Sequence, residues 1–232
     1  PPALAIALAI LAGAAVGFIN GSIIVGFRMM PFIVTLGMMG IVRGAAKWLA
    51  NNQTVNAPPD SPVGQLMARV NPTEFWPLPP GVWIALGLAA LMAVVLQKTV
   101  FGRYVFAIGA NETAARYSGV QVGPVKAATY AISGLLIGCA GLLQMSRLTQ
   151  GDPTVAVGLE LDIIAAVVIG GASLSGGVGS IPGSLIGALI MALLRNGTNQ
   201  LGWQTYSQEI IIGMVIVLAV GLDQWRQSRR GG

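Results

Sequence analysis

Charged side chains are scarce in this chain, and five of them gather in a 29-residue segment from Lys98 to Lys126. The segment reads KTVFGRYVFAIGANETAARYSGVQVGPVK and holds four cations and the carboxylate of Glu112. The 16 residues before it and the 20 residues after it carry no charge. Ionic groups of this kind can bind a partner in water, and a basic connector between apolar segments is typical of the cytoplasmic side of a membrane. We therefore expect residues 98–126 to lie in the cytoplasm and to meet a water-soluble partner.

The inner part of this connector has the signals of a short helix. Asn111 can cap its start, and Glu112 follows in the first turn, where a carboxylate is favoured by the exposed amides and the helix dipole. Gly119 is placed to end the helix in a left-handed conformation. We predict a helix between these residues.

Small side chains on this helix predict a close contact. Ala114 and Ala115 would let the helix sit tightly in a groove of a partner. The alternative is a solvated helix that lies on the lipid headgroups, drawn there by Arg116. The pattern leaves both interpretations open.

Enzymatic chemistry has little support in the sequence. The chain contains no histidine, which removes the HExxH zinc motif, Ser–His dyads and histidine metal sites. It has no GxxxxGK[ST] loop for nucleotide phosphates, so we do not expect it to hydrolyse ATP itself. An intramembrane aspartyl protease would need two facing carboxylates, and only Asp162 lies near a span interior. We predict no catalytic residues, no metal and no cofactor, and a packing role for the single cysteine, Cys139.

Composition places the chain in a membrane. Its 232 residues are 54% hydrophobic and 9% charged, whereas a soluble domain has about 25% charged residues. The net charge of +5 fits cytoplasmic loops near anionic lipid. No basic patch with interleaved aromatic residues points to nucleic acid, which we exclude as a partner.

Apolar segments long enough to cross a bilayer recur along the chain, since a span needs about 20 residues. The predicted fold is an all-α polytopic membrane helix bundle of about seven spans, at residues 3–24, 31–50, 81–98, 127–146, 160–175, 180–198 and 207–223. The chain opens PPALAIALAI without a Met or a basic stretch. The first run therefore fits a span better than a signal peptide, and we expect the natural N-terminus to lie upstream.

A glycine-rich break divides the charge-free run from Ile163 to Leu194. Its centre, GGASLSGGVGSIPG, holds six glycines and a proline. Irregular backbone at membrane depth is tolerated only where protein or a water-filled cavity covers it. The break is therefore either an internal re-entrant turn that lines a pathway, through Gly170 and Gly171, or a cytoplasmic loop that does not.

The distribution of cations sets the expected orientation. Placing 98–126 inside puts eight basic residues inside and five elsewhere, in the sense of the positive-inside rule. It makes the segment 51–80, with seven of the 13 prolines, an irregular external loop. Trp76 and Trp83 bracket its return to the membrane and are expected at the headgroup boundary.

Glycine spacing permits close helix contacts, but several four-residue pairs arise by chance among 32 glycines, so the spacing supports a multi-helix bundle and little more. Gly13 to Gly17, Gly17 to Gly21, Gly134 to Gly138 and Gly183 to Gly187 are each four residues apart, which places each pair on one helix face.

Charges near the spans are the remaining candidates. Glu160 and Asp162 precede an apolar run, and Arg147 lies across the short external loop GDPTVAVGL. They can form a gate at the outer mouth of a pathway. The interpretation that the pattern favours is an interfacial pair that anchors two spans. Asn196 can offer a hydrogen bond to a polar solute, or it can end its helix.

Several runs together resemble one family. FGRYVFAIGANETAARYSGVQVGPVK, then LELDIIAAVVIGGASLSGGVGSIPGSLIGALI, then NGTNQLG, and earlier PFIVTLGMMGIVRG, are similar to the permease subunit of bacterial ribose-type sugar ABC importers. The resemblance covers nearly the whole chain, and the motifs are specific in this order. The family's N-terminal two or three spans, with a GGIDLSVG-like stretch, have no counterpart in this sequence.

The resemblance implies a multi-pass protein of the bacterial inner membrane. Residues 1–232 would form a single transmembrane permease domain with an external loop at 51–80 and a cytoplasmic coupling segment at 98–126. A second permease copy would complete a homodimeric pore in lipid, a periplasmic sugar-binding protein would deliver a monosaccharide, and a cytoplasmic ABC ATPase would drive alternating access. The coupling helix, at 111–120, would meet the ATPase through Asn111, Glu112, Ala114, Ala115, Arg116 and Gly119. Candidates for the pathway or gate are Asp162, Gly170, Gly171 and Asn196.

Two other classes of transporter stay open at this point. One is an ABC permease for branched-chain amino acids or another small solute, such as an autoinducer sugar. The other is a self-sufficient channel or secondary transporter, with ion coupling through Asp162. Uptake without an ATPase would identify the latter.

Overall fold

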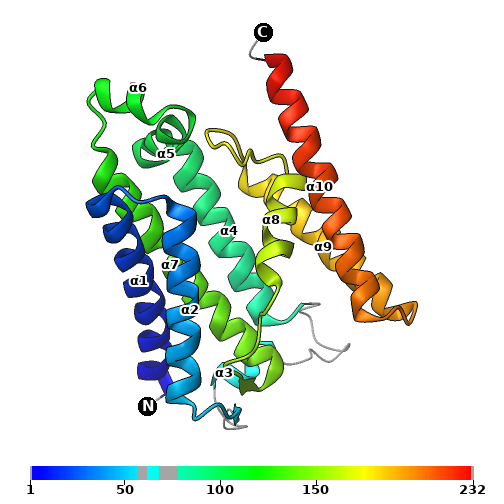
Figure 1. The fold of residues 1–232 in the computed structure, drawn as a ribbon. Coiled ribbons are helices and arrows are strands. Elements are labelled where there is room, and N and C mark those ends of the chain that lie inside the picture. Colours follow the sequence, from blue (N-terminus) through cyan, green and yellow to red (C-terminus); the bar gives the residue numbers. More distant parts are fainter. Residues whose placement is uncertain (1, 57–61, 68–77, 231–232) are drawn as a thin grey trace. The chain divides into compact units, whose positions relative to one another are not determined.

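The computed structural model of the chain describes residues 2–56, 62–67 and 78–230. Helices make up most of this part, as Figure 1 shows, and confirm the predicted all-α class. The helices are α1 (Pro2–Phe27), α2 (Pro31–Leu49), α3 (Pro62–Gln65), α4 (Pro80–Lys98), α5 (Val100–Ala110), α6 (Glu112–Tyr117), α7 (Val122–Leu148), α8 (Leu159–Ile169), α9 (Ile181–Gln200) and α10 (Thr205–Arg230). Two short strands, β1 (Val55–Asn56) and β2 (Gln150–Gly151), pair antiparallel.

Each of the seven predicted spans corresponds to a helix, but not all of these helices have the length of a span. Within the described residues, α1, α2, α4, α7 and α9 are long and apolar enough to cross a membrane. The segment predicted at 160–175 is helical only as α8, whose 11 residues extend about 16 Å, less than the ~30 Å hydrocarbon core. It ends early because Gly170 and Gly171, the latter at φ +87°, close the helix. The last predicted span lies within α10.

The chain folds as two compact units. Unit 1 contains Pro1–Leu88 and Gln121–Val155, and unit 2 contains Ala89–Val120 and Ala156–Gly232. Helix α4 therefore begins in unit 1 and ends in unit 2.

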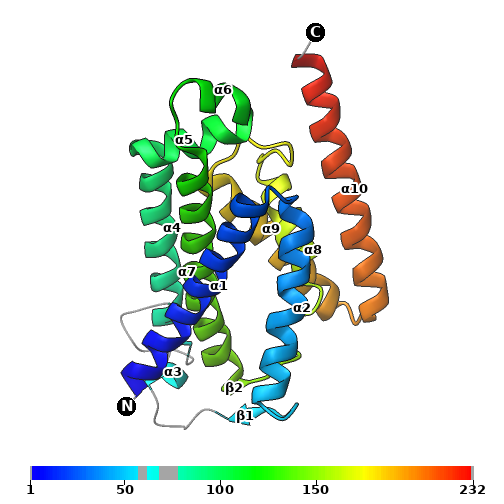
Figure 2. The same cartoon turned by 60° about the vertical axis from the view of Figure 1, so that its left-hand side comes forward.

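Unit 1 is built on the pair α1 and α7, which lie side by side over most of their length (Figure 2). A Cβ added at Gly13 or Gly17 would overlap the carbonyl oxygens of Gly134 and Tyr130 respectively, and one added at Gly21 would lie 2.8 Å from the Cα of Ala127. The glycines thus let the two backbones touch, a contact that the four-residue spacing permits.

Part of the predicted external loop folds back onto the end of α7. The backbone N–H of Met67 donates to the Oγ of Ser146 at 2.7 Å, and that of Gly81 donates to the carbonyl of Leu66 at 2.7 Å. Strand β1 pairs with β2 just beyond α7. Residues 57–61 and 68–77, with Trp76, lie outside the described part, and Trp83 is exposed in the first turn of α4.

The next loop is ordered by its own polar groups. The carboxylate of Asp152 accepts from the hydroxyl of Thr154 at 2.6 Å and from its backbone N–H at 2.7 Å. Both bonds favour the ionised form, so they lower the pKa of Asp152, the hydroxyl contributing most.

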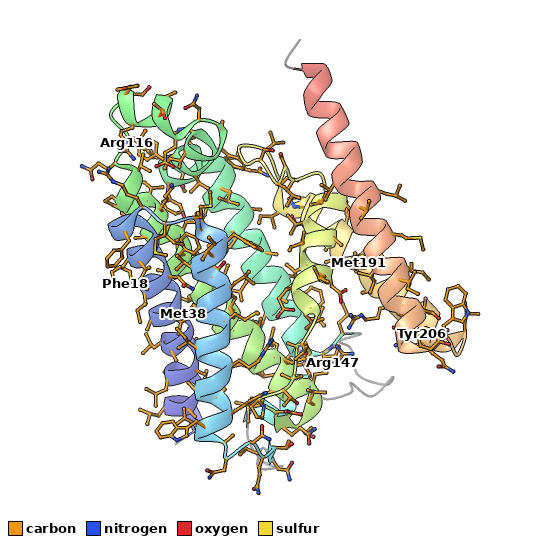
Figure 3. The ribbon with its side chains drawn as sticks, viewed as in Figure 1. Phe18, Met38, Arg116, Arg147, Met191 and Tyr206 are labelled. Atoms are coloured by element: carbon orange, nitrogen blue, oxygen red, sulfur yellow. The ribbon has the colours of Figure 1, made fainter. Side chains whose placement is uncertain are left out.

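Unit 2 has its core among α8, α9 and α10. Ala165, Ala166, Met191 and Ile212 form one buried apolar cluster, and Figure 3 marks Met191 within it. Helices α8 and α9 form a hairpin in which a Cβ at Gly187 would overlap the carbonyl of Ala166, so glycine again sets the distance between helices. The glycine-rich break is therefore the turn of this hairpin.

Candidate functional site

The polar connector begins with a tight corner between α4 and α5. The Oγ1 of Thr99 donates to the carbonyl of Val95 at 2.6 Å and accepts from the N–H of Gly102 at 3.2 Å, which caps α5. A Cβ at Gly102 would overlap the carbonyl of Leu96. Helix α5 was not predicted, although Thr99 is the cap residue that signals it.

Helix α6 has the capping that the sequence predicted. The Oδ1 of Asn111 accepts from the N–H of Ala114 at 2.9 Å, and Asn111 also ends α5, because its own N–H donates to the carbonyl of Ala107 at 3.0 Å. Gly119 has φ +84° and lies just beyond the last turn. One residue thus joins α5 to α6, which fixes the direction of the short helix.

The outer surface of α6 carries charge and one aromatic ring. The Nη2 of Arg116 lies 3.2 Å from the Oε1 of Glu112, and both side chains are open to solvent (Figure 3 marks Arg116). Ala114 is exposed, but Ala115 is only 6% exposed and faces its own chain. Tyr117 is 88% exposed, the most open of the large hydrophobic side chains described.

Tyr117 is a candidate that the sequence analysis missed. A tyrosine in the last turn of a capped helix, within a charged water-facing segment, is the signal that could have found it. Exposed aromatic residues and arginines are enriched at the centres of protein interfaces. The arrangement of Glu112, Arg116 and Tyr117 can therefore bind another protein.

The second group of candidates lies on the α8–α9 hairpin. Asp162 in the first turn of α8 is ion-paired with Arg195 of α9, with side chains that are 14% and 45% exposed respectively. Asp162 thus pairs with Arg195 within the hairpin, a partner that the sequence analysis did not name. The pair connects α8 to α9, and it also remains partly accessible.

Polar side chains continue from this pair along α9 toward α10. The Nε2 of Gln208, which is buried, donates to the Oδ1 of Asn199 at 2.7 Å and to the carbonyl of Trp203 at 3.3 Å. Asn196 is exposed on α9, and Gly170 and Gly171 lie at the other end of the hairpin. The structure therefore does not bring the four pathway candidates to one place.

Among the residues that the structure describes, no group of three or more His, Cys, Asp or Glu side chains could hold a metal ion.

Comparison with known proteins gives a family and several relatives. The family described as "Branched-chain amino acid transport system / permease component" matches residues 1–220. The chain is 42% identical to the ribose import permease protein of Escherichia coli (strain K12), over 97% of this chain and 70% of that protein. It is 38% identical to an L-arabinose ABC transporter permease of Azospirillum brasilense (98% and 66%) and 36% identical to the fructose import permease of Rhizobium meliloti (97% and 63%). No solved structure matches the chain.

Proposed function

The chain belongs to the permease-component family of the branched-chain amino acid transport systems, and we propose that it is the membrane subunit of an ATP-driven importer of a monosaccharide. It lies in the inner membrane as a multi-pass helical protein, in agreement with the five long apolar helices found among the described residues. Its task is translocation, and ATP hydrolysis belongs to a separate subunit.

A sugar is favoured as the substrate over an amino acid. The family description names branched-chain amino acids, but relatives that cover most of this chain are import permeases for ribose, L-arabinose and fructose. The chain matches these three sugar permeases at 36–42% identity. The pentoses and the hexose share hydroxyl chemistry, so we keep the proposal at the level of a monosaccharide.

The observation that carries the proposal is the exposed, capped surface of α6. Tyr117, Arg116 and Glu112 face solvent at the end of a helix whose direction is fixed by Asn111. Tyrosine and arginine are the residue types that most often anchor protein interfaces, and a groove on the ATPase subunit would cover the ring of Tyr117. Ala114 can approach the same groove, while the buried Ala115 and the left-handed Gly119 shape the helix.

Both units would act as one translocation domain. A second copy of the chain would complete the pore in lipid, and a periplasmic sugar-binding protein would deliver the substrate. When ATP closes the ATPase, the coupling helices of the two copies would move with it, and the spans would rock between inward-open and outward-open states. The small and polar residues of the α8–α9 hairpin, with Asp162, Gly170, Gly171 and Asn196, would line or gate the pathway.

Copurification with the ATPase tests the proposal. Replacing Tyr117 by alanine should weaken the affinity for the ATPase about 30-fold or more and so reduce its retention on the tagged permease, because a central aromatic anchor contributes about 2 kcal/mol or more. Replacing Glu112 by arginine should also weaken retention. The matched control is Tyr206→Ala, which removes an exposed tyrosine from α10 and should leave retention unchanged.

Two results would contradict the proposal. Equal retention by the Tyr117 and Tyr206 variants would show that α6 is not the docking surface. Uptake of labelled ribose, arabinose or fructose into liposomes that contain the permease without any ATPase would identify a channel or secondary transporter instead.

A further inference from the structure

The turn between α8 and α9 is a compact structure held by its own backbone. The N–H of Ser173 donates to the carbonyl of Val178 at 3.0 Å, and the N–H of Gly176 donates to the carbonyl of Ser173 at 3.1 Å. Gly176 and Gly177 at the tip have φ values of +92° and +73°, which favour glycine. The tip is therefore a fixed shape.

This tip lies directly against the end of α5, as Figures 1 and 2 both show for the yellow turn after α8. A Cβ at Gly109 would lie 2.6 Å from the backbone N of Gly177, and one at Gly176 would lie 2.5 Å from the carbonyl oxygen of Gly109. A Cβ at Gly177 would lie 2.7 Å from the Cα of Ala110. Three glycines thus bring two backbones into contact, with no side chain between them.

The end of α5 is joined to α6 by a single residue. Ala110 is the last residue of α5, and Asn111 is both the C-cap of α5 and the N-cap of α6. A displacement of α6 therefore carries Gly109 and Ala110 with it.

The turn is joined just as closely to the hairpin behind it. A Cβ at Gly170 or Gly183 would overlap the backbone of the other residue, so α8 and α9 are in contact where the turn begins. The Oγ of Ser180 also caps α9 by accepting from the N–H of Gly183 at 3.1 Å. A movement of the turn would therefore displace both α8 and α9.

We propose that the backbone contact of Gly109 with Gly176 and Gly177 transmits the movement of the coupling helix to the α8–α9 hairpin. This inference rests on the proposed function, since it assumes that an ATPase moves α6. It assigns a mechanical role to the turn, beyond the connection of α8 to α9.

Gly109→Ala is the sharpest test, because alanine is well suited to a helix and only its contact with Gly177 is too close. The importer would be reconstituted with its ATPase and binding protein in liposomes of phosphatidylethanolamine and phosphatidylglycerol. The variant should retain the ATPase and hydrolyse ATP, while uptake of labelled ribose, arabinose and fructose per ATP falls at least about 10-fold, our threshold for lost coupling. The control Gly213→Ala, on α10 with open space around it, should keep the normal ratio.

The outcomes separate this inference from the proposed function. Normal uptake per ATP in the Gly109 variant, with the unaltered importer active, would overturn the transmission contact alone. An unaltered protein that binds no ATPase, or transports none of the three sugars, would overturn both.

Hydrogen exchange on the unaltered complex gives a second test, which does not depend on how the variant folds. Addition of a non-hydrolysable ATP analogue should change exchange in residues 112–119 and in residues 170–180 together. A change confined to 112–119 would overturn the inference, because the two segments would then move independently.

Discussion

The α1–α7 pair of unit 1 and the α8–α9 hairpin of unit 2 both bring helix backbones together through glycine, but they differ in what supports the contact. In the first pair, Gly13, Gly17 and Gly21 meet α7 over three successive turns. In the hairpin, the glycine contacts lie toward the turn, and the Asp162–Arg195 ion pair joins the far ends.

This difference has a physical origin. Between helices in lipid there is no hydrophobic driving force, so packing and polar bonds decide stability. The long pair has repeated packing, in helices of 26 and 27 residues, and behaves as a scaffold. The hairpin has a short α8 and few separate contacts, so a change at one of them can alter its shape without unfolding it.

The largest effect is expected in the long pair. Gly17→Leu places a side chain against the carbonyl of Tyr130, where no rotamer avoids the backbone. Overpacking of this kind costs about 3 kcal/mol or more when backbone must move. We expect a strong loss of folded protein, measured as the monodisperse fraction in size-exclusion chromatography after detergent extraction.

Gly26→Leu provides the control on the same helix. Gly26 has open space around it, so leucine there should leave the yield of folded protein unchanged. Similar yields for the two leucine variants would show that the α1–α7 contact is not the scaffold of unit 1.

A smaller effect is expected from the ion pair of the hairpin. Asp162→Asn keeps the shape of the side chain but removes its charge. Because Arg195 is 45% exposed, solvent screening limits the coupling between the two side chains to about 1 kcal/mol. A double-mutant cycle with Arg195→Gln, measured from detergent-induced unfolding, gives this value directly.

The result of that cycle sharpens the comparison. Zero coupling would mean that the hairpin, like the long pair, is held by packing and not by its ion pair. A coupling of several kcal/mol would mean that the ion pair, and not the turn, determines the structure of the hairpin.

The sequence predicted much of this arrangement, but not which helices pack against each other. Four-residue glycine spacing predicted which face of each helix packs closely, yet nothing in it could say that α1 meets α7. In the hairpin, the contacts of Gly170 with Gly183 and of Ala166 with Gly187 imply that Asp162 faces position 191. Arg195 lies one turn further, and its long side chain reaches Asp162. That register depends on the turn, whose structure could not be predicted from composition.

The connector shows the same limit. Asn111 and Gly119 predicted the start and end of α6, because capping is a local property. The exposure of Tyr117 and the burial of Ala115 depend on how α6 packs against its own chain, and they became visible only in the structure.

The smallest effect is expected where α10 meets α9. Gln208→Leu removes the hydrogen bond to Asn199 and the longer one to the carbonyl of Trp203 from a buried position. Hydrogen bonds between membrane helices contribute about 0.6 kcal/mol on average, and leucine restores part of this by packing. Asn199 is exposed and can bond to water instead, so it is not left unsatisfied. We therefore expect a loss of stability too small to alter folding, measured in the same unfolding assay. A loss as large as that of Gly17→Leu would mean that α10 is held by this polar bond, which would make unit 2 dependent on hydrogen bonds where unit 1 depends on glycine packing.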